Sequence, residues 1–327
     1  MLDFTKVMSA AVLAATTAGA AMAQESRTFE VSLPLGPESH QAVGVHKFGE
    51  ELERLSEGRL TIRPQYDNAL GAEREVVEGM GFGLIDMGIT STGPMGGFVN
   101  DFLLFDLPYI FTTPEAAYGF LDGEHGDALA AKLESEAGVK ILGWMENGFR
   151  HNTNNVRPLN GPEDLAGIRH RTQESRVQVD TWTALGANAS PMAWTEVFTA
   201  LQQGVMDSQE NPVPTIYDVK FYDVQRYLNL TKHVYSPAPL MMGAQLFNSL
   251  SPEDQALVME AAAIAVPVQR EASQRMEQEL IDELERLGMT VTRPDLEPFR
   301  ERVQPVIEQW KDTVGAELVE AAQASGS

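Results

Sequence analysis

The pattern between Ser251 and Gly288 constrains the fold most, because it predicts one helix that is too long for a single ordinary domain. Ser251-Pro252-Glu253-Asp254 supplies an N-cap, a proline at the first helical position and acidic residues in the first turn. Pro267 should bend the helix. A coiled coil is the rival interpretation, but the mixed spacing of apolar residues favours packing on a globular body. We therefore predict a helix that spans two domains. Its apolar positions are Leu257, Ala261, Ile264, Val268, Ala272, Met276, Leu280, Leu284 and Leu287.

The rest of the chain alternates between strand and helix patterns. Thr28 to Leu33 reads as a strand, and a helix capped by Ser39 and stopped by Gly58 follows it. This alternation predicts α/β layers with mainly parallel sheets. The length of 327 residues allows two domains. We expect one from 24–148 plus 237–276 and the other from 149–236 plus 277–327. Further strands are expected at Leu84 to Ile89, Val139 to Trp144, Gly167 to Arg171 and Val205 to Asp207.

The first residues predict export. Lys6 precedes an uncharged, Ala-rich stretch from Val7 to Ala20, and Ala21-Met22-Ala23-Gln24 offers a cleavage site. We predict a signal peptide over 1–23, with an amphipathic N-terminal helix as the alternative. The sequence has no cysteine, which excludes disulfides, thiolate metal sites, a cysteine nucleophile and a lipid anchor. We expect a soluble protein in the periplasm.

Charge and motifs exclude several classes of function. The formal net charge of −23 argues against binding of nucleic acid or of an anionic membrane, and no membrane-inserted segment of the mature chain is expected. The sequence has no G-x-S-x-G, H-E-x-x-H or Walker motif. Its six histidines lack metal-ligand spacing. We therefore predict no catalytic residue, no metal and no cofactor.

An anion can still bind an acidic protein through a local cationic pocket. Arg171 ends a predicted strand and Asn211 ends another, and open α/β sheets bind ligands at the carboxyl ends of their strands. Arg150 follows the expected domain junction. A guanidinium can grip a carboxylate with two hydrogen bonds. On spacing alone, surface or structural salt bridges are the favoured interpretation of Arg150 and Arg171.

Many ordered blocks resemble one family, the DctP-like solute-binding subunits of tripartite ATP-independent periplasmic (TRAP) transporters. The resemblance runs from about Phe29 to the tail helix. The blocks are Leu70-Gly71-Ala72-Glu73-Arg74-Glu75, Asp106-Leu107-Pro108-Tyr109-Ile110-Phe111, the stretch from Pro162 to Arg171, Pro191-Met192-Ala193-Trp194, and Gln209-Glu210-Asn211-Pro212.

The resemblance implies two α/β domains around a cleft, a long bent helix spanning both, and closure on the ligand. It implies that Arg171 grips the ligand carboxylate and that Arg150 is a second cationic contact. Asn211 matches a ligand-facing carboxamide, and Trp194 matches an aromatic residue that packs over the ligand. Weaker matches place Ser91 and Ser39 at the ligand.

Departures from the family pattern leave the ligand open. His170 and Thr172-Gln173 replace the usual hydrophobic residue and Val-Pro around the arginine, and Ser208 replaces a common glycine. Ser91 takes the place of an acidic residue found in some sialic-acid binders. Two arginines favour a dianion or a polar acid, whereas Trp194 favours a flat or apolar portion. C4-dicarboxylates, aromatic or keto acids, sugar acids, sulfonates and zwitterions all stay possible.

The expected function is capture of a small organic anion, a carboxylate, in the periplasm of a Gram-negative bacterium. The resemblance implies delivery to the small and large membrane subunits of a sodium-coupled TRAP transporter, by a protein that we expect to be monomeric. A sensor that presents its ligand to a receptor is one alternative. A periplasmic enzyme with the same type of cleft is another, although no motif supports it.

Overall fold

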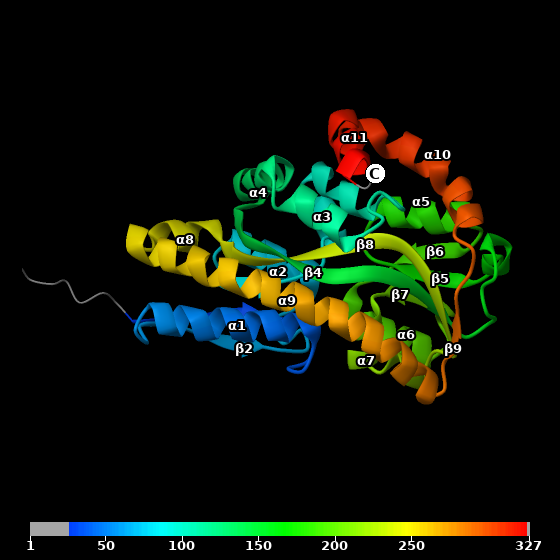
Figure 1. Ribbon diagram of the computed structural model, residues 1–327, viewed down its shortest axis with the longest axis horizontal. Coiled ribbons are helices and arrows are strands. Elements are labelled where there is room, and N and C mark those ends of the chain that lie inside the picture. Colours follow the sequence, from blue (N-terminus) through cyan, green and yellow to red (C-terminus); the bar gives the residue numbers. More distant parts are fainter. Residues whose placement is uncertain (1–25, 326–327) are drawn as a thin grey trace, which may run out of the picture.

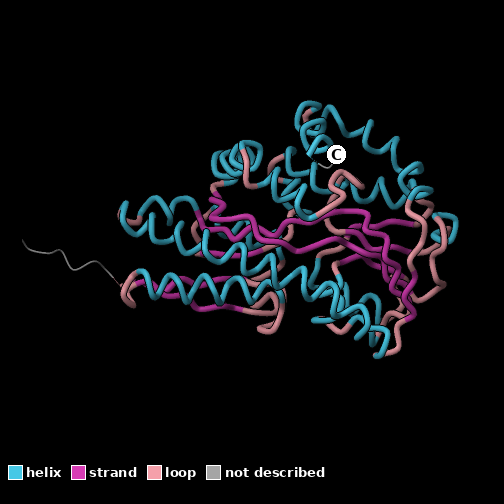
Figure 2. The backbone as a smooth tube through the Cα atoms, viewed as in Figure 1, coloured by secondary structure: helices cyan, strands magenta, loops and turns pink. Residues whose placement is uncertain are grey.

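The computed structural model describes residues 26–325, so the predicted signal peptide lies outside the described residues. In this part of the chain the strands form one nine-stranded sheet in the order β2-β1-β3-β8-β4-β7-β5-β6, with β9 paired to β8. Helices cover both faces of the sheet (Figures 1 and 2). Among the described helices, none has the length and apolarity needed to cross a bilayer.

One end of the sheet is parallel. It contains β1 (Arg27–Ser32), β2 (Leu60–Gln65) and β3 (Met87–Ile89), joined by α1 (His40–Leu55) and α2 (Glu73–Gly81). Ser39 caps α1 as expected, because its hydroxyl accepts a hydrogen bond from the Ala42 N–H at 3.2 Å. We call this end of the sheet with its helices, including α8 (Ala244–Ser249), the first lobe.

The centre of the sheet corrects the expectation of mainly parallel strands. β4 (Val139–Asn154) and β8 (Tyr227–Gly243) have 16 and 17 residues and pair antiparallel along nearly their whole length. β4 therefore extends ten residues beyond the strand expected to end at Trp144. Register shifts interrupt the pairing, one of them between Glu146 and Gly148. These two strands run through both lobes (Figure 1).

The other end of the sheet, with its helices, is the second lobe. The strand expected at Val205 to Asp207 lies instead at Ser208–Asn211. Val205 and Met206 donate backbone hydrogen bonds to the Ala200 carbonyl and so belong to the end of the preceding helix. The strands of this lobe are β5 (Arg169–Thr172), β6 (Asn188–Pro191), β7 (Ser208–Asn211) and β9 (Thr290–Thr292), and its helices are α5 (Arg176–Ala184), α6 (Val197–Gln202) and α7 (Val213–Asp218).

The long helix predicted from the sequence is α9 (Pro252–Arg286), and it spans both lobes (Figure 1). Its first half packs on α1 through Ala261 and Ala265, and Leu284 near its end enters the core of the second lobe. The tail helices α10 (Glu297–Val314) and α11 (Ala316–Ser325) cover the same face as α3 (Pro114–Leu121) and α4 (Glu124–Ala137).

The tail also connects two cores. Phe299 and Val303 pack with Trp182 of the second lobe, whereas Val306 and Val314 pack with the large aromatic core around Phe105. The domain boundaries proposed from the sequence stay a prediction. The two-domain α/β architecture with a spanning helix is confirmed.

Two glycines in helices provide a direct test of how closely α9 packs on the first lobe. A Cβ added to Gly44 of α1 would lie 2.6 Å from the Cγ of Gln269 on α9, whereas a Cβ added to Gly119 of α3 meets no atom within 4 Å. We expect Gly44→Ala to lower the free energy of unfolding by about 1–3 kcal/mol through overpacking. Gly119→Ala should raise it by roughly 0.5–1 kcal/mol. Urea unfolding of the two variants measures both effects, and equal stabilities would contradict the packing.

Candidate functional site

Loops that follow β1, β3, β5, β6 and β7 meet at one cavity between the lobes. Its empty space is about 250 Å³. The position agrees with the rule that open α/β sheets bind ligands beyond the carboxyl ends of their strands. The lining is mostly polar, and it consists of Pro34, Leu35, Gln41, Glu73, Ser91, Asn147, Arg150, Gln173, Trp194, Asn211 and Thr215.

The irregularity in β4 explains why two of these residues reach the cavity. Asn147 lies at the register shift between Glu146 and Gly148, where it has no partner in the pairing with β8. Such bulges redirect side chains. Its Oδ1 accepts a hydrogen bond from the Gln41 Nε2 of α1 at 3.1 Å. Arg150 follows on the same strand and also lines the cavity.

Arg150 is buried in a charge-compensated arrangement. Its guanidinium donates to both carboxylate oxygens of Glu210 on β7, and Nη2 also donates to the Glu210 carbonyl at 2.8 Å. Burial alone would raise the pKa of Glu210, but Arg150 and His233 outweigh that effect and hold it well below its ordinary value. The Nη1 of Arg150 is buried without a hydrogen-bond partner among the described residues. The ion pair of Arg150 and Glu210 is therefore neutral overall, and the Nη1 group of Arg150 can still donate hydrogen bonds.

Arg171 at the end of β5 is buried without a carboxylate partner among the described residues. Its Nε and Nη2 donate to the Met192 carbonyl at 3.0 and 2.8 Å, and its Cζ lies 5.9 Å from the Trp194 ring centre. Nη1 has no partner there either. Burial lowers the pKa of Arg171 to about 10, so the side chain keeps its charge at neutral pH. It is an uncompensated buried cation, which favours an anionic ligand.

A carboxyl group and an amide form another part of the cavity wall. Both the N–H and the hydroxyl of Ser91 donate to Glu73 Oε1, at 2.7 and 2.9 Å. Gln173 Nε2 donates to Ser91 Oγ at 2.6 Å. Burial raises the pKa of Glu73. This wall therefore contains both hydrogen-bond donors and acceptors.

Three hydrogen bonds join the lobes across the cavity and its rim. Besides the bond between Gln173 and Ser91, the indole N–H of Trp194 donates to the Pro34 carbonyl at 3.3 Å. At the third contact, the Gly36 N–H after β1 donates to the Asp218 carboxylate of α7 at 3.1 Å. These bonds connect segments of the first lobe to segments of the second.

The structure brings four of the six predicted site residues onto this cavity. Ser91, Arg150, Trp194 and Asn211 line it. Arg171 lies behind the Trp194 ring, and Ser39 is not a lining residue because its hydroxyl caps α1 and donates to the Gly36 carbonyl. Their ligand contacts stay a prediction. The sequence reasoning missed Glu73, Gln41, Asn147 and Thr215, and it noted Gln173 only as a departure from the family pattern.

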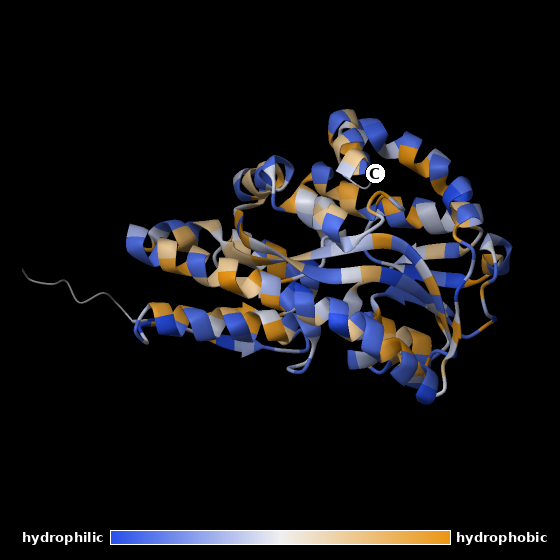
Figure 3. Ribbon diagram, in the orientation of Figure 1, coloured by the Kyte–Doolittle hydropathy of each residue, from blue (hydrophilic) through white to orange (hydrophobic). Residues whose placement is uncertain are grey.

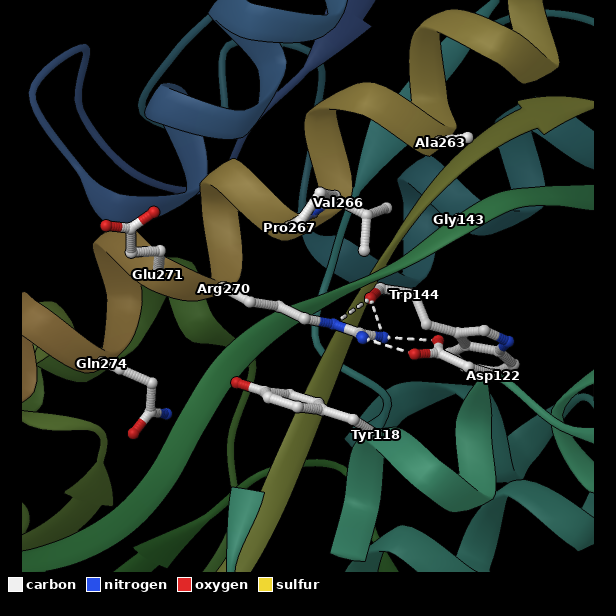
Figure 4. A pocket seen from close by; sticks show the side chains of 10 residues that line it. All are labelled: Tyr118, Asp122, Gly143, Trp144, Ala263, Val266, Pro267, Arg270, Glu271 and Gln274. Carbon is white, nitrogen blue, oxygen red and sulfur yellow. Dashed lines mark hydrogen bonds and ion pairs between the residues drawn. The ribbon is translucent and has the colours of Figure 1, made fainter. Parts of the chain in front are cut away.

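A larger hollow lies beside α9. Its empty space is about 1050 Å³, and mainly apolar surface from Trp144, Val266 and Pro267 lines it. Figure 4 shows Arg270 held between the carboxylate of Asp122 and the Trp144 carbonyl. Because these bonds occupy its guanidinium, the hollow offers no free cation and is a poorer anion site than the cavity between the lobes.

His170 is packed in the protein interior. His170 stacks on Trp182 with ring centres 3.7 Å apart, and burial lowers its pKa to about 3. Among residues 26–325, no group of three or more potential ligand side chains is placed to hold a metal ion.

Comparison with known proteins identifies the family. The family model for the bacterial extracellular solute-binding proteins, family 7, matches residues 32–313. The chain belongs to this family. The fold and the interlobe cavity described above are therefore those of a DctP-like protein, and the resemblance recognised in the sequence is confirmed.

Three similar proteins add detail. A TRAP periplasmic solute-binding protein from Polaromonas sp. JS666, bound to D-erythronate, is 38% identical with a TM-score of 0.89, covering 92% of this chain and 99% of that one. The sugar acid binding protein DctPAm from Advenella mimigardefordensis, in complex with galactonate, is 32% identical with a TM-score of 0.90, covering 93% and 98%. The 2,3-diketo-L-gulonate-binding periplasmic protein YiaO of Escherichia coli (strain K12) is 34% identical, covering 84% of each chain.

The chain is thus a solute-binding protein of the DctP family, as the sequence predicted, and similar TRAP solute-binding proteins bind small organic acids. The family binds solutes and is periplasmic.

The buried carboxyl of Asp106 behind the cavity wall should make stability depend on pH. Burial raises its pKa from 3.8 to about 7. The folded state therefore binds a proton more tightly than the unfolded state, and the stability that this proton contributes is lost as the pH rises from about 4 through about 7. Asp106→Asn removes this titration. Relative to wild type, the variant should gain up to about 1.4 kcal/mol of unfolding free energy per pH unit in this range.

Urea unfolding at pH 5, 6, 7 and 8 tests this expectation. The same substitution at the exposed Asp282 controls for the loss of one acidic side chain. A constant stability difference between Asp106→Asn and wild type across the four pH values would show that Asp106 does not titrate there.

Proposed function

We propose that the organic acid is a small hydroxylated monocarboxylate, a sugar acid, and that the closed protein delivers it to TRAP membrane subunits. The observation that carries the ligand class is the charge pattern of the cavity. Glu210 neutralises Arg150, whereas Arg171 has no carboxylate partner among the described residues.

The balance of charge supports one carboxylate in the ligand. Arg171 contributes a positive charge that no carboxylate contacts among the described residues, and Glu73 disfavours an anionic group near its own part of the wall. A dianion would leave a buried negative charge uncompensated, which costs several kcal/mol. The two arginines, which suggested a dianion in the sequence, are thus not equivalent.

The remaining lining suits hydroxyl groups. Gln41, Asn147, Gln173, Asn211 and Thr215 carry amides and a hydroxyl, which both donate and accept hydrogen bonds. An alcohol does the same, whereas an aliphatic chain would leave atoms such as Gln41 Oε1 and Thr215 Oγ1, which have no partner in the described chain, unpaired.

The known ligands of similar proteins support the same class. D-erythronate and galactonate are hydroxylated monocarboxylates, and they occupy proteins that are 38% and 32% identical to this chain. The related protein from Escherichia coli is named for 2,3-diketo-L-gulonate, another sugar acid.

Capture would proceed by closure of the lobes. The ligand enters while the lobes are apart, its carboxylate pairs with Arg171, and the second lobe then swings towards the first. The contacts of Trp194 with Pro34, of Gln173 with Ser91 and of Asp218 with Gly36 form at that moment. Closure excludes water and strengthens the charge pairing. The closed surface would dock on the membrane subunits, and the ligand would leave unchanged, because a binding protein does no chemistry on it.

Arg171→Met tests the ligand assignment. The variant should lose at least about 2–5 kcal/mol of binding free energy for D-erythronate or D-galactonate, which is roughly a thirty- to several-thousand-fold loss of affinity. Isothermal titration calorimetry on the mature chain measures the loss, and Arg157→Met at an exposed position is the matched control. Unchanged binding by Arg171→Met, or a wild-type preference for succinate over both aldonates, would overturn the proposal.

Reconstitution tests delivery and export. Membrane vesicles that contain the co-encoded membrane subunits should take up labelled aldonate only when the mature chain and a sodium gradient are present. Wild-type binding without uptake would favour the sensor alternative.

Protein recovered from a periplasmic extract should begin near Gln24, and a chain that still begins at Met1 would contradict a cleaved signal peptide.

A further inference from the structure

The carboxamide of Gln173 faces the cavity with an orientation that depends on a neighbour outside it. Gln178 lies on the first turns of α5, is buried, and does not line the cavity. Three hydrogen bonds hold its side chain. Its Oε1 accepts from the Gln173 backbone N–H at 3.0 Å, and its Nε2 donates to Gln173 Oε1 at 2.9 Å and to Asp106 Oδ1 at 2.7 Å.

These hydrogen bonds determine the direction in which the oxygen and the nitrogen of the Gln178 and Gln173 carboxamides point. A backbone N–H can only donate, so the oxygen of the Gln178 side chain must face it. The Gln178 nitrogen then faces Gln173, and the Gln173 side chain must present its oxygen to Gln178. Its nitrogen therefore points away from α5 and donates to Ser91 Oγ at 2.6 Å. The orientation follows from one main-chain donor rather than from a free choice of rotamer.

The position of Gly93 prevents the Gln173 amide from moving aside. A Cβ at Gly93 would lie only 2.5 Å from Gln173 Oε1, so the oxygen packs directly against this main chain. Gln178 and Gly93 together leave the amide one arrangement.

The fixed amide sets the hydrogen-bonding character of the cavity wall. Gln173 Nε2 uses one hydrogen for Ser91 and has a second without an acceptor among the described residues. On the other side of Ser91, Glu73 Oε2 makes no hydrogen bond in the described chain. A free donor and a free acceptor thus flank Ser91. A hydroxyl group can use both, because it accepts and donates at once.

The reverse orientation of the amide would change what the wall can bind. It would place the Gln173 oxygen beside Ser91 and Glu73, and the wall would then present acceptors alone. A hydroxyl could no longer accept a hydrogen bond there.

We propose that Gln178 is a positioning residue for specificity: it holds the Gln173 carboxamide with its N–H group towards the ligand, so that this wall selects a ligand hydroxyl. The inference rests on the proposed sugar-acid ligand. It means that recognition of one ligand hydroxyl depends on Gln178, a residue that does not contact the ligand.

Gln178→Met tests the proposal, because methionine keeps the size of the side chain but loses both amide groups. The probes are D-erythronate and its three singly deoxygenated analogues, titrated by calorimetry into the mature chain. In wild type, removal of the hydroxyl at this wall should weaken binding by about tenfold or more, because it leaves buried polar groups unpaired.

In Gln178→Met, the ratio of the affinity for erythronate to the affinity for the analogue that lacks this hydroxyl should fall to about twofold or less. Erythronate should weaken towards the level of the deoxy analogue, while the affinity for the analogue itself changes little. Gln203→Met at an exposed position is the matched control and should keep the wild-type ratio. Thermal unfolding confirms that each variant is folded.

The outcomes separate this inference from the proposed function. General damage to the site would weaken all four ligands equally and leave the ratio unchanged, and that result would overturn the role of Gln178 alone. A wild type that binds erythronate and every deoxy analogue equally would also overturn it. A wild type that binds no hydroxy acid would overturn the proposed ligand class and this inference together.

Discussion

The pairing of β4 with β8 is the constraint on which the other features depend. These strands run antiparallel through both lobes, so the two halves of the molecule share a single sheet rather than a flexible linker. Their register shift at Asn147 lies where the chain passes between the lobes, and it turns the Asn147 side chain towards the cavity. This irregularity in the strand is therefore also part of the candidate site. Figure 3 shows how hydrophilic the strands are beyond this point, although Asn152, Gln209 and Asn229 are fully buried.

Burial of so many polar groups is tolerable because most of them pair with one another. Asn229 and Asn152 are joined by a hydrogen bond of 2.9 Å, and Gln209 donates to Thr153 at 2.8 Å. The Nη1 atoms of Arg150 and Arg171 are among the buried polar atoms that have no partner in the described part of the chain. In a protein interior an unpaired donor costs about 1–3 kcal/mol, and more when it is charged. Those atoms point to where a ligand supplies the missing acceptors.

Local patterns predicted the elements whose burial follows a simple period. The long helix could be predicted because its apolar residues repeat at helical spacing, and Ser39 could be predicted to cap the N-terminus of α1. β8 was missed, because Lys232, Pro237 and Pro239 interrupt any alternation in a strand that is buried on both faces. Arg171 was singled out by its place at the end of a predicted strand, and the resemblance to the family gave both arginines their expected role at the ligand. Glu73 could not be singled out among 47 acidic residues, since only its contact with Ser91 places it at the cavity. The unequal charge compensation of the two arginines depends on Glu210, which a sequence cannot place.

The way α9 and the tail enter several cores has a consequence for how the molecule unfolds. Ala261 and Leu284 belong to one helix but to different lobes, and Phe299 and Val314 likewise belong to one helix and different cores. If one lobe loses its packing, apolar side chains of the other lobe are exposed to water. The two halves are therefore coupled thermodynamically, and they form one cooperative unit despite the cleft between them. A fragment cut at the domain junction would lack part of its own interior, so hinge motion in this protein is compatible with all-or-none folding.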